Sequence, residues 1–114
     1  MINKYIVITI GIFLLNNILI WYQLNSQLVW DWAKGSKSMW TMSLFGIPIS
    51  ILFWYATKWG YIGFGNLWAV RFLGFATSMI TFPIMTYFYL GETITLKTLI
   101  TILLAIIIMI LQLL

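Results

Sequence analysis

The chain lacks cysteine and histidine entirely, and its only acidic residues are Asp31 and Glu92. Without cysteine and histidine there are no disulfides, thiol nucleophiles, histidine proton switches or zinc sites of the usual kind. The two acids fall in different predicted loops, so a catalytic carboxylate pair is not expected. No nucleophile–base set or metal set can be assembled, and we therefore expect neither an enzyme nor a bound cofactor or metal.

Charge of either sign is also scarce, at 7% of 114 residues, whereas 63% of the residues are hydrophobic. About a quarter of the residues in a soluble domain are charged, so this chain has too little polar surface for water. A lipid-facing surface explains the composition. The six basic residues are scattered among the loops, which argues against a nucleic-acid partner. We expect a multi-pass protein of a bacterial-type inner or cell membrane, with the lipid bilayer as its surroundings.

Four apolar segments are each close to the roughly 20 residues that a helix needs to cross a bilayer. We expect a single all-α domain over residues 1–114, with approximate transmembrane spans at residues 5–22, 39–57, 66–90 and 95–114. A cleaved signal peptide is the alternative for the first segment, but no small-residue cleavage site follows it. The short connection near Gly91 predicts that the last two helices are antiparallel neighbours.

The segments between and within the spans carry weaker signals. Residues 27–34 contain two tryptophans and could form a short interfacial helix. Residues 58–65 contain three glycines, which is typical of a turn. Pro48 and Pro83 fall inside predicted spans, where Pro48 frees the carbonyl of Leu44. Each proline could mark a static kink or a mobile hinge.

Tryptophans flank the predicted loops, among them Trp21, Trp40, Trp54 and Trp68. Tryptophan prefers the lipid headgroup region because it combines a large apolar ring system with a polar N–H group. We expect these side chains to lie at the membrane interface. The alternative is that some of them pack between helices.

The basic residues do not favour one orientation in the membrane. Four spans place both ends of the chain on one side. Lys4, Lys58 and, nearby, Arg71 lie on that side, and Lys34, Lys37 and Lys97 lie on the other. Because basic residues set topology, this balance favours insertion in both orientations and pairing with an inverted copy. A single orientation is the alternative if Arg71 lies too deep to count.

Each predicted helix carries small or polar residues at helical spacing. These stripes are Thr9, Asn16 and Gln23; Ser43, Gly46, Ser50 and Thr57; Arg71, Gly74, Ser78 and Thr81; and Thr98, Thr101, Ala105 and Gln112. Such residues let helices approach and form interhelical hydrogen bonds of about 0.6–2 kcal/mol each, although some could instead line a polar cavity.

Arg71 is a costly residue in a predicted span, at about 2.5–3.5 kcal/mol for an arginine at the bilayer centre. It could extend to the surface along its apolar stem, or it could bind an anionic or polar group inside a cavity. Glu92 could complement the dipole of the last helix, or serve in substrate or coupling-ion binding. About 30 Å of helix separates it from Arg71, so only an inverted dimer would bring the two together as a salt bridge.

The architecture and the segment FYLGETITLKTLITILLAIIIMILQLL resemble the drug/metabolite transporter superfamily. The most similar forms are its small four-helix members, which include the small multidrug resistance proteins. The Gly91-Glu92 turn is similar to the turn that joins their last two helices. The segment IWYQL at residues 20–24 resembles the aromatic end of the first helix in a related small family.

This resemblance implies an antiparallel homodimer in which the first three helices form a chamber and the fourth helix dimerises. The expected dimer interface on that helix consists of Thr98, Thr101, Ala105 and Ile108. It places Arg71 where the multidrug members carry a substrate-facing aromatic, and Gly74 near their conserved tryptophan. Those exporters exchange protons for cations at a glutamate on the first helix, where this chain has only Asn16 and Asn17. The usual cation mechanism therefore cannot operate, and the fold does not by itself carry over the substrate class.

We therefore expect a small transporter-like protein that works as a homodimer on a neutral or anionic small molecule. The candidate substrate-binding residues are Arg71, Asn16, Asn17, Trp68, Gly74 and Ser78. The runner-up is a non-transporting membrane subunit or assembly protein whose polar stripes only pack helices. A channel is the third option, and it requires a continuous water-filled pore.

Overall fold

The computed structural model describes residues 3–114, and all the regular structure in that part of the chain is helical. The helices are α1 (Lys4–Val29), α2 (Ser36–Leu44), α3 (Gly46–Phe64), α4 (Leu67–Leu90) and α5 (Leu96–Leu113), with a 3-10 turn η1 (Asp31–Ala33) after α1. Helices α2 and α3 together form one span, which gives four helices long and apolar enough to cross a membrane. The prediction of an all-α chain with four such helices is confirmed.

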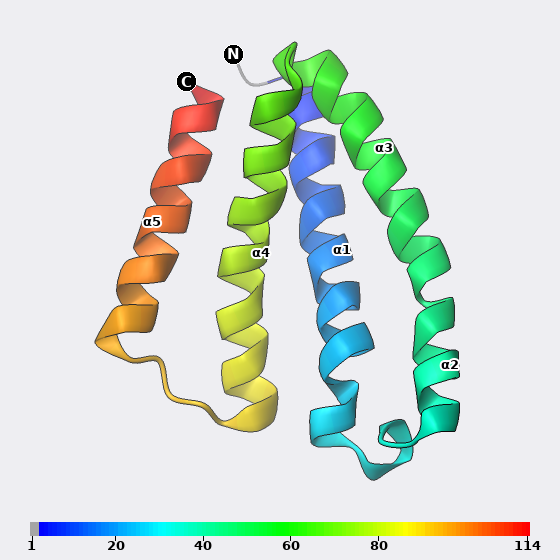
Figure 1. Ribbon diagram of the computed structural model, residues 1–114. Coiled ribbons are helices and arrows are strands. Elements are labelled where there is room, and N and C mark those ends of the chain that lie inside the picture. The colour runs from blue at the N-terminus through cyan, green and yellow to red at the C-terminus, as the bar shows by residue number, and fades with distance from the viewer. Residues whose placement is uncertain (1–2) are drawn as a thin grey trace.

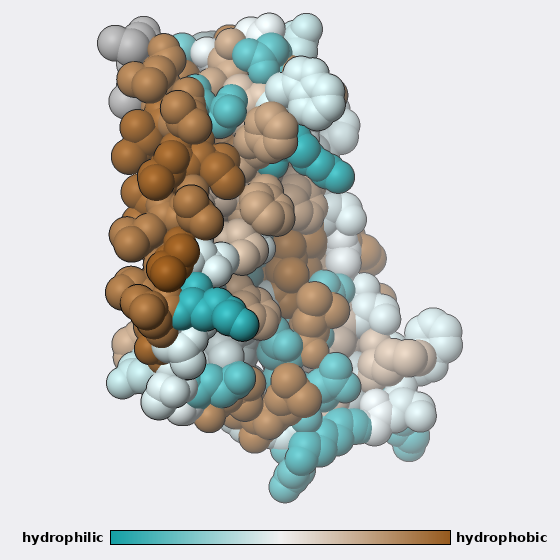
Figure 2. Space-filling view, turned by 60° about the vertical axis from the view of Figure 1, so that its left-hand side comes forward, coloured by the Kyte–Doolittle hydropathy of each residue, from teal (hydrophilic) through white to brown (hydrophobic). Residues whose placement is uncertain are grey.

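The four spans run alternately up and down, so that α1 begins and α5 ends at the same end of the molecule (Figure 1). Helix α1 packs against both α3 and α4, whereas α5 packs only against α4. The core lies where α1, α3 and α4 meet, and its central side chains are Phe13, Ala56, Val70 and Leu73. Figure 2 shows the side formed by α5 as an almost continuous hydrophobic surface, as expected for a helix in contact with lipid.

The helix ends follow from local sequence. The side-chain oxygen of Asn66 accepts a hydrogen bond from Ala69 N at 2.8 Å and caps α4, and that of Thr95 accepts from Thr98 N at 3.2 Å and caps α5. At the other ends, Gly65 (φ 80°) closes α3 and Gly91 (φ 69°) closes α4. Glycine suits both positions because it adopts left-handed backbone angles without a steric penalty.

Two of the three glycines in residues 58–65 do not form the predicted turn. Gly60 and Gly63 lie inside α3, where α1 passes too close for a side chain. A Cβ atom at Gly60 would lie 3.1 Å from Cγ2 of Thr9, and one at Gly63 would lie 3.1 Å from the backbone nitrogen of Ile6. These glycines therefore serve helix packing, and only Gly65 makes the turn.

The first helix is longer than its predicted apolar span. It continues past residue 22 to Val29, and the interfacial helix predicted at residues 27–34 is replaced by the end of α1 and by η1. Its last turn closes when Trp30 N donates to the carbonyl of Ser26 at 2.9 Å. Hydropathy marks where a helix is apolar, but backbone hydrogen bonding continues into polar sequence as long as nothing breaks it.

The two prolines act differently. Helix α2 ends at Leu44, four residues before Pro48, and Phe45 N turns back to Met42 O at 3.0 Å before α3 begins. This break lies where the proline ring meets the carbonyl of Leu44 and offers it no donor. Pro83, in contrast, lies inside the uninterrupted helix α4.

Candidate functional site

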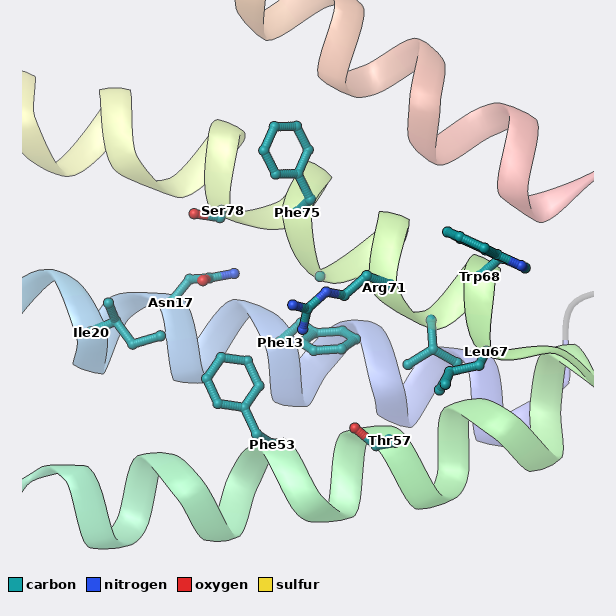
Figure 3. A pocket seen from close by; sticks show the side chains of 12 residues that line it. Phe13, Asn17, Ile20, Phe53, Thr57, Leu67, Trp68, Arg71, Phe75 and Ser78 are labelled. Atoms are coloured by element: carbon teal, nitrogen blue, oxygen red, sulfur yellow. The ribbon is translucent and has the colours of Figure 1, made fainter.

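A cavity of about 870 Å³ lies between α1, α3 and α4, a size typical of small-molecule sites. Figure 3 shows it with α1 and α3 on one side and α4 on the other. Its lining is mostly apolar and aromatic, with a few polar groups. The lining residues are Phe13, Asn17, Ile20, Phe53, Thr57, Leu67, Trp68, Val70, Arg71, Gly74, Phe75 and Ser78.

Arg71 is the single charged residue of this lining. It is the fifth residue of α4, which begins at Leu67. Figure 3 shows its side chain pointing into the cavity, in the direction of Phe13 and Asn17, and away from the Leu67 end of the helix. The guanidinium therefore does not extend along α4 to the nearer membrane surface, which was one of the two expectations from the sequence.

No carboxylate within residues 3–114 neutralises Arg71. Asp31 forms an ion pair with Lys34 at 3.2 Å, and both residues lie at the opposite end of the molecule. Glu92 is exposed and follows the far end of α4. It lies outside the first turn of α5, where a charge complements a helix dipole most strongly, and Thr95 caps that helix. The cavity consequently has a net positive charge.

Gly74 lies opposite the ring of Phe13. A Cβ atom at Gly74 would lie 3.0 Å from Cε1 of Phe13, so a side chain at this position would displace the ring. Phe13 and Phe53 also contact each other, with their ring centroids 6.2 Å apart. Because Gly74 has no side chain, the ring of Phe13 can pack directly against α4.

Asn17 lines the cavity and also forms a hydrogen bond between α1 and α4. Its Nδ2 donates a hydrogen bond to Oγ1 of Thr77 at 3.0 Å, and the hydroxyl of Thr77 is itself within reach of the carbonyl of Leu73 at 2.9 Å. The Asn17 side chain is thus held in a defined position at the edge of the cavity (Figure 3). Ser78, one residue after Thr77, is half-buried and also lines the cavity.

Asn16 is the one predicted chamber residue that does not line this cavity. Successive residues of a helix point about 100° apart, so Asn16 and Asn17 face different neighbours. Asn16 shares its face with Thr9, which contacts Gly60, and with Gln23, which donates to Met42 O at 3.2 Å. Its side chain is fully buried, and neither its nitrogen nor its oxygen has a hydrogen-bond partner among residues 3–114. Five of the six predicted residues therefore meet in one cavity, and Asn16 faces the α2–α3 side.

The predicted dimer face of α5 is turned toward the same chain. Ala105 is only 2% exposed, and α5 packs only against α4. Thr98, Thr101 and Ile108 are half-buried. The small and polar residues of α5 thus allow it to approach α4, and the face left free carries leucine and isoleucine side chains. The stripe was identified from the sequence, but the sequence did not show which helix it meets.

The sequence did not mark the apolar part of the cavity. In the sequence, three of its lining residues look like any other apolar residues of a span: Phe13, Phe53 and Phe75. Only the packing of three helices brings them to the same cavity as Arg71. Thr57 did carry a signal, because it belongs to the polar stripe of its helix and lines the cavity.

A second aromatic group joins the C-terminal ends of α1 and α4, away from Arg71. Trp21 is only 2% exposed, stacks on Tyr89 with centroids 5.1 Å apart, and donates from Nε1 to Oγ1 of Thr86 at 3.1 Å. Tyr22 and Tyr89 share a further hydrogen bond between their hydroxyl groups. Trp21 therefore packs between helices, which was the alternative expectation, and a neighbouring helix satisfies its N–H group. Trp40 remains 70% exposed.

No protein-family model, curated protein or solved structure matches this chain.

Proposed function

We propose that this chain is a small membrane transporter of the drug/metabolite transporter type, with its substrate site in the cavity between α1, α3 and α4. The observation that supports this proposal is the cavity itself, which has a ligand-sized volume and lies between membrane-spanning helices. Helices that only packed against one another would fill that space with side chains, since protein interiors are close-packed.

The charge of the cavity limits the substrate. Arg71 is unpaired within residues 3–114, and no acid lines the cavity. A cation would be repelled there, whereas a neutral or anionic molecule would meet the guanidinium, an amide and two hydroxyl groups. The proposed substrate is therefore a neutral or anionic small molecule.

The second candidate is a non-transporting membrane subunit. It is favoured by the polar side chains that bond between helices, because Asn17 donates to Thr77 and Trp21 donates to Thr86. These bonds account for four polar side chains of α1 and α4 by packing. They do not account for the orientation of Arg71 or for the space in front of it.

Cysteine accessibility separates the two candidates, and the chain has no cysteine of its own to interfere. We expect Ser78→Cys to react with a water-soluble, membrane-impermeant thiol reagent, because a substrate cavity must be reachable from water. Phe82→Cys is the control, since Phe82 lies one turn further along α4 and its side chain is exposed on the surface of the span. Thiols in lipid are protonated and react slowly.

The measurement compares labelling rates of the two variants in inside-out and right-side-out membranes. A transporter predicts that Ser78→Cys reacts at least tenfold faster than Phe82→Cys in both preparations, because a chain inserted in both orientations presents both of its sides to the reagent in either one. Equal, slow labelling of both positions would favour the non-transporting subunit.

We further propose an antiparallel homodimer in which the outer face of α5 meets the partner. That face is long, apolar and exposed in the single chain, with Leu103 at 50% and Ile107 at 50%. The balance of three basic residues on each side permits both orientations.

Reporters fused to the C-terminus test the orientation. A reporter active only inside the cell and one active only outside should both give signal at comparable levels, within about threefold of each other. Adding two lysines at one end should shift the population to one orientation, because basic residues set topology. Signal from a single side in the unaltered chain would exclude the antiparallel arrangement.

A further inference from the structure

The cavity combines one strong cation with a large apolar surface. Arg71 is its only charge, and the aromatic rings of Phe13, Phe53 and Phe75 contribute much of the rest. Recognition of a small hydrated anion needs several polar groups and gains nothing from aromatic walls. An uncharged apolar molecule, in turn, gains nothing from a guanidinium, whose desolvation costs free energy.

The lining of the cavity extends along the membrane normal, away from the start of α4. Arg71 lies about 6 Å from the start of α4, and Ser78 lies about 10 Å deeper, at a rise of 1.5 Å per residue. Figure 3 shows the guanidinium of Arg71 reaching from its helix in the direction of Ser78, to about the level of Phe75, with Phe53 and Ile20 further in the same direction. A ligand with its charge at Arg71 would therefore extend its apolar part toward the centre of the bilayer.

The cavity opens sideways, toward the bilayer. Phe75 is 57% exposed and Phe53 is 40% exposed, although both lie in the middle of membrane-spanning helices. Helix α5 does not cover this opening, because it packs against α4 alone and Figure 1 shows it on the other side of α4 from α3. An apolar ligand could thus remain partly in contact with lipid while its charged group is bound.

We propose that the cavity binds an amphipathic anion, with a carboxylate or phosphate monoester at Arg71 and an apolar body against Phe13, Phe53 and Phe75. This proposal rests on the proposed function, since it names the ligand class of the same cavity. A guanidinium suits such a head group because its planar donors match carboxylate and phosphate in pairs. The apolar body is either an acyl chain of a membrane lipid or the ring system of a free organic acid.

The test uses a fatty acid that carries a photoreactive diazirine on its chain, incorporated into proteoliposomes of the full chain. After illumination, labelled peptides are mapped by mass spectrometry. We expect labelling of Phe53 and Phe75 or their neighbours, and we expect Arg71→Gln to reduce it at least fivefold. Arg71→Lys keeps the charge and should retain more than half of the labelling. This result would show that Arg71→Gln loses labelling because it loses the charge, and not because the protein misfolds.

Lys58→Gln is the matched control for general attraction of anions to a basic surface. Lys58 lies on α3, with its ammonium group 5.2 Å from the ring centre of Trp54, and it does not line the cavity. Labelling in this variant should stay within twofold of the unaltered protein. An equal loss in Lys58→Gln and Arg71→Gln would overturn the proposal.

Competition by unlabelled compounds tests each part of the ligand. Oleate should compete, whereas its methyl ester, which lacks the charge, and acetate, which lacks the apolar body, should not. Competition by 1-naphthoate would identify free organic acids as the source, and competition by oleate alone would identify membrane acyl anions. If the methyl ester or acetate competes as well as oleate, the proposal is wrong.

If Ser78→Cys reacts with water-soluble reagents but the diazirine probe does not label the cavity, only the ligand class is wrong and the proposed function stands.

Discussion

Replacing Gly60 with leucine is expected to destabilise the fold by about 3 kcal/mol, the upper part of the usual range for overpacking. Gly60 is buried where α3 meets both α1 and α4. Even a Cβ atom there would lie 3.0 Å from a methyl group of Val70 and 3.1 Å from that of Thr9. Thr9 and Val70 are themselves buried, so they cannot move aside and the helices must separate.

The matched control is Gly11→Leu. Gly11 also lies in a membrane-spanning helix, but a Cβ atom there would meet nothing within 4 Å. The two variants thus add the same side chain and the same helix propensity, and they differ only in the available space. Thermal unfolding in a mild detergent, followed by helical circular dichroism, should show a loss for Gly60→Leu and little change for Gly11→Leu. Similar values for both would show that α1 and α3 are not in close contact.

Replacing Trp21 with alanine should cost about 3 kcal/mol, the lower end of the range for removing a buried tryptophan. The indole is almost fully buried, stacks on Tyr89 and donates to Thr86, so its removal leaves both a cavity and an unpaired hydroxyl group. The loss of unfolding free energy falls at the lower end of this range because lipid and detergent are themselves apolar, so helix association in membranes depends on packing and hydrogen bonds. The pair α1–α4 would lose this stacking and the hydrogen bond to Thr86 at the end away from Arg71, and the Tyr22–Tyr89 hydrogen bond would remain.

Two further variants separate the contribution of the Trp21 hydrogen bond from that of its burial. Trp21→Phe keeps an aromatic ring near Tyr89 but loses the hydrogen bond to Thr86, and we expect it to cost about 1 kcal/mol, as for other interhelical hydrogen bonds in membranes. Trp40→Ala removes the same side chain from a position that is 70% exposed, and it should change the unfolding free energy by less than about 0.5 kcal/mol. Unfolding by increasing denaturing detergent measures all three. If Trp40→Ala destabilises as much as Trp21→Ala, the burial of Trp21 does not explain its role.

Tryptophans illustrate the limit of reading positions from composition alone. Trp21 and Trp40 both lie near the ends of apolar segments, and the sequence predicts the same interfacial position for both. Only the approach of α4 decides between them, because Thr86 and Tyr89 lie 65 and 68 residues later in the chain and meet Trp21 through tertiary packing.

The polar stripes show the same limit in the candidate site. Helical spacing alone placed Arg71, Gly74 and Ser78 on one face, and the structure brings that face to the cavity. Spacing also placed Thr101 and Ala105 together on α5, but their neighbour is α4 of the same chain. Periodicity shows which residues share a face, and it contains no information on which helix that face meets.

The sequence by itself determined that the chain forms four apolar helices with little charge, because hydropathy and length are local properties that lipid selects directly. It also placed an arginine in a span and excluded an acid from the first helix. The tertiary structure decided that Gly60 and Gly63 serve packing, that Asn16 is buried away from the cavity and that three phenylalanines line the same cavity as Arg71. These outcomes depend on the angles and distances between helices, which result from side-chain contacts between residues far apart in the sequence.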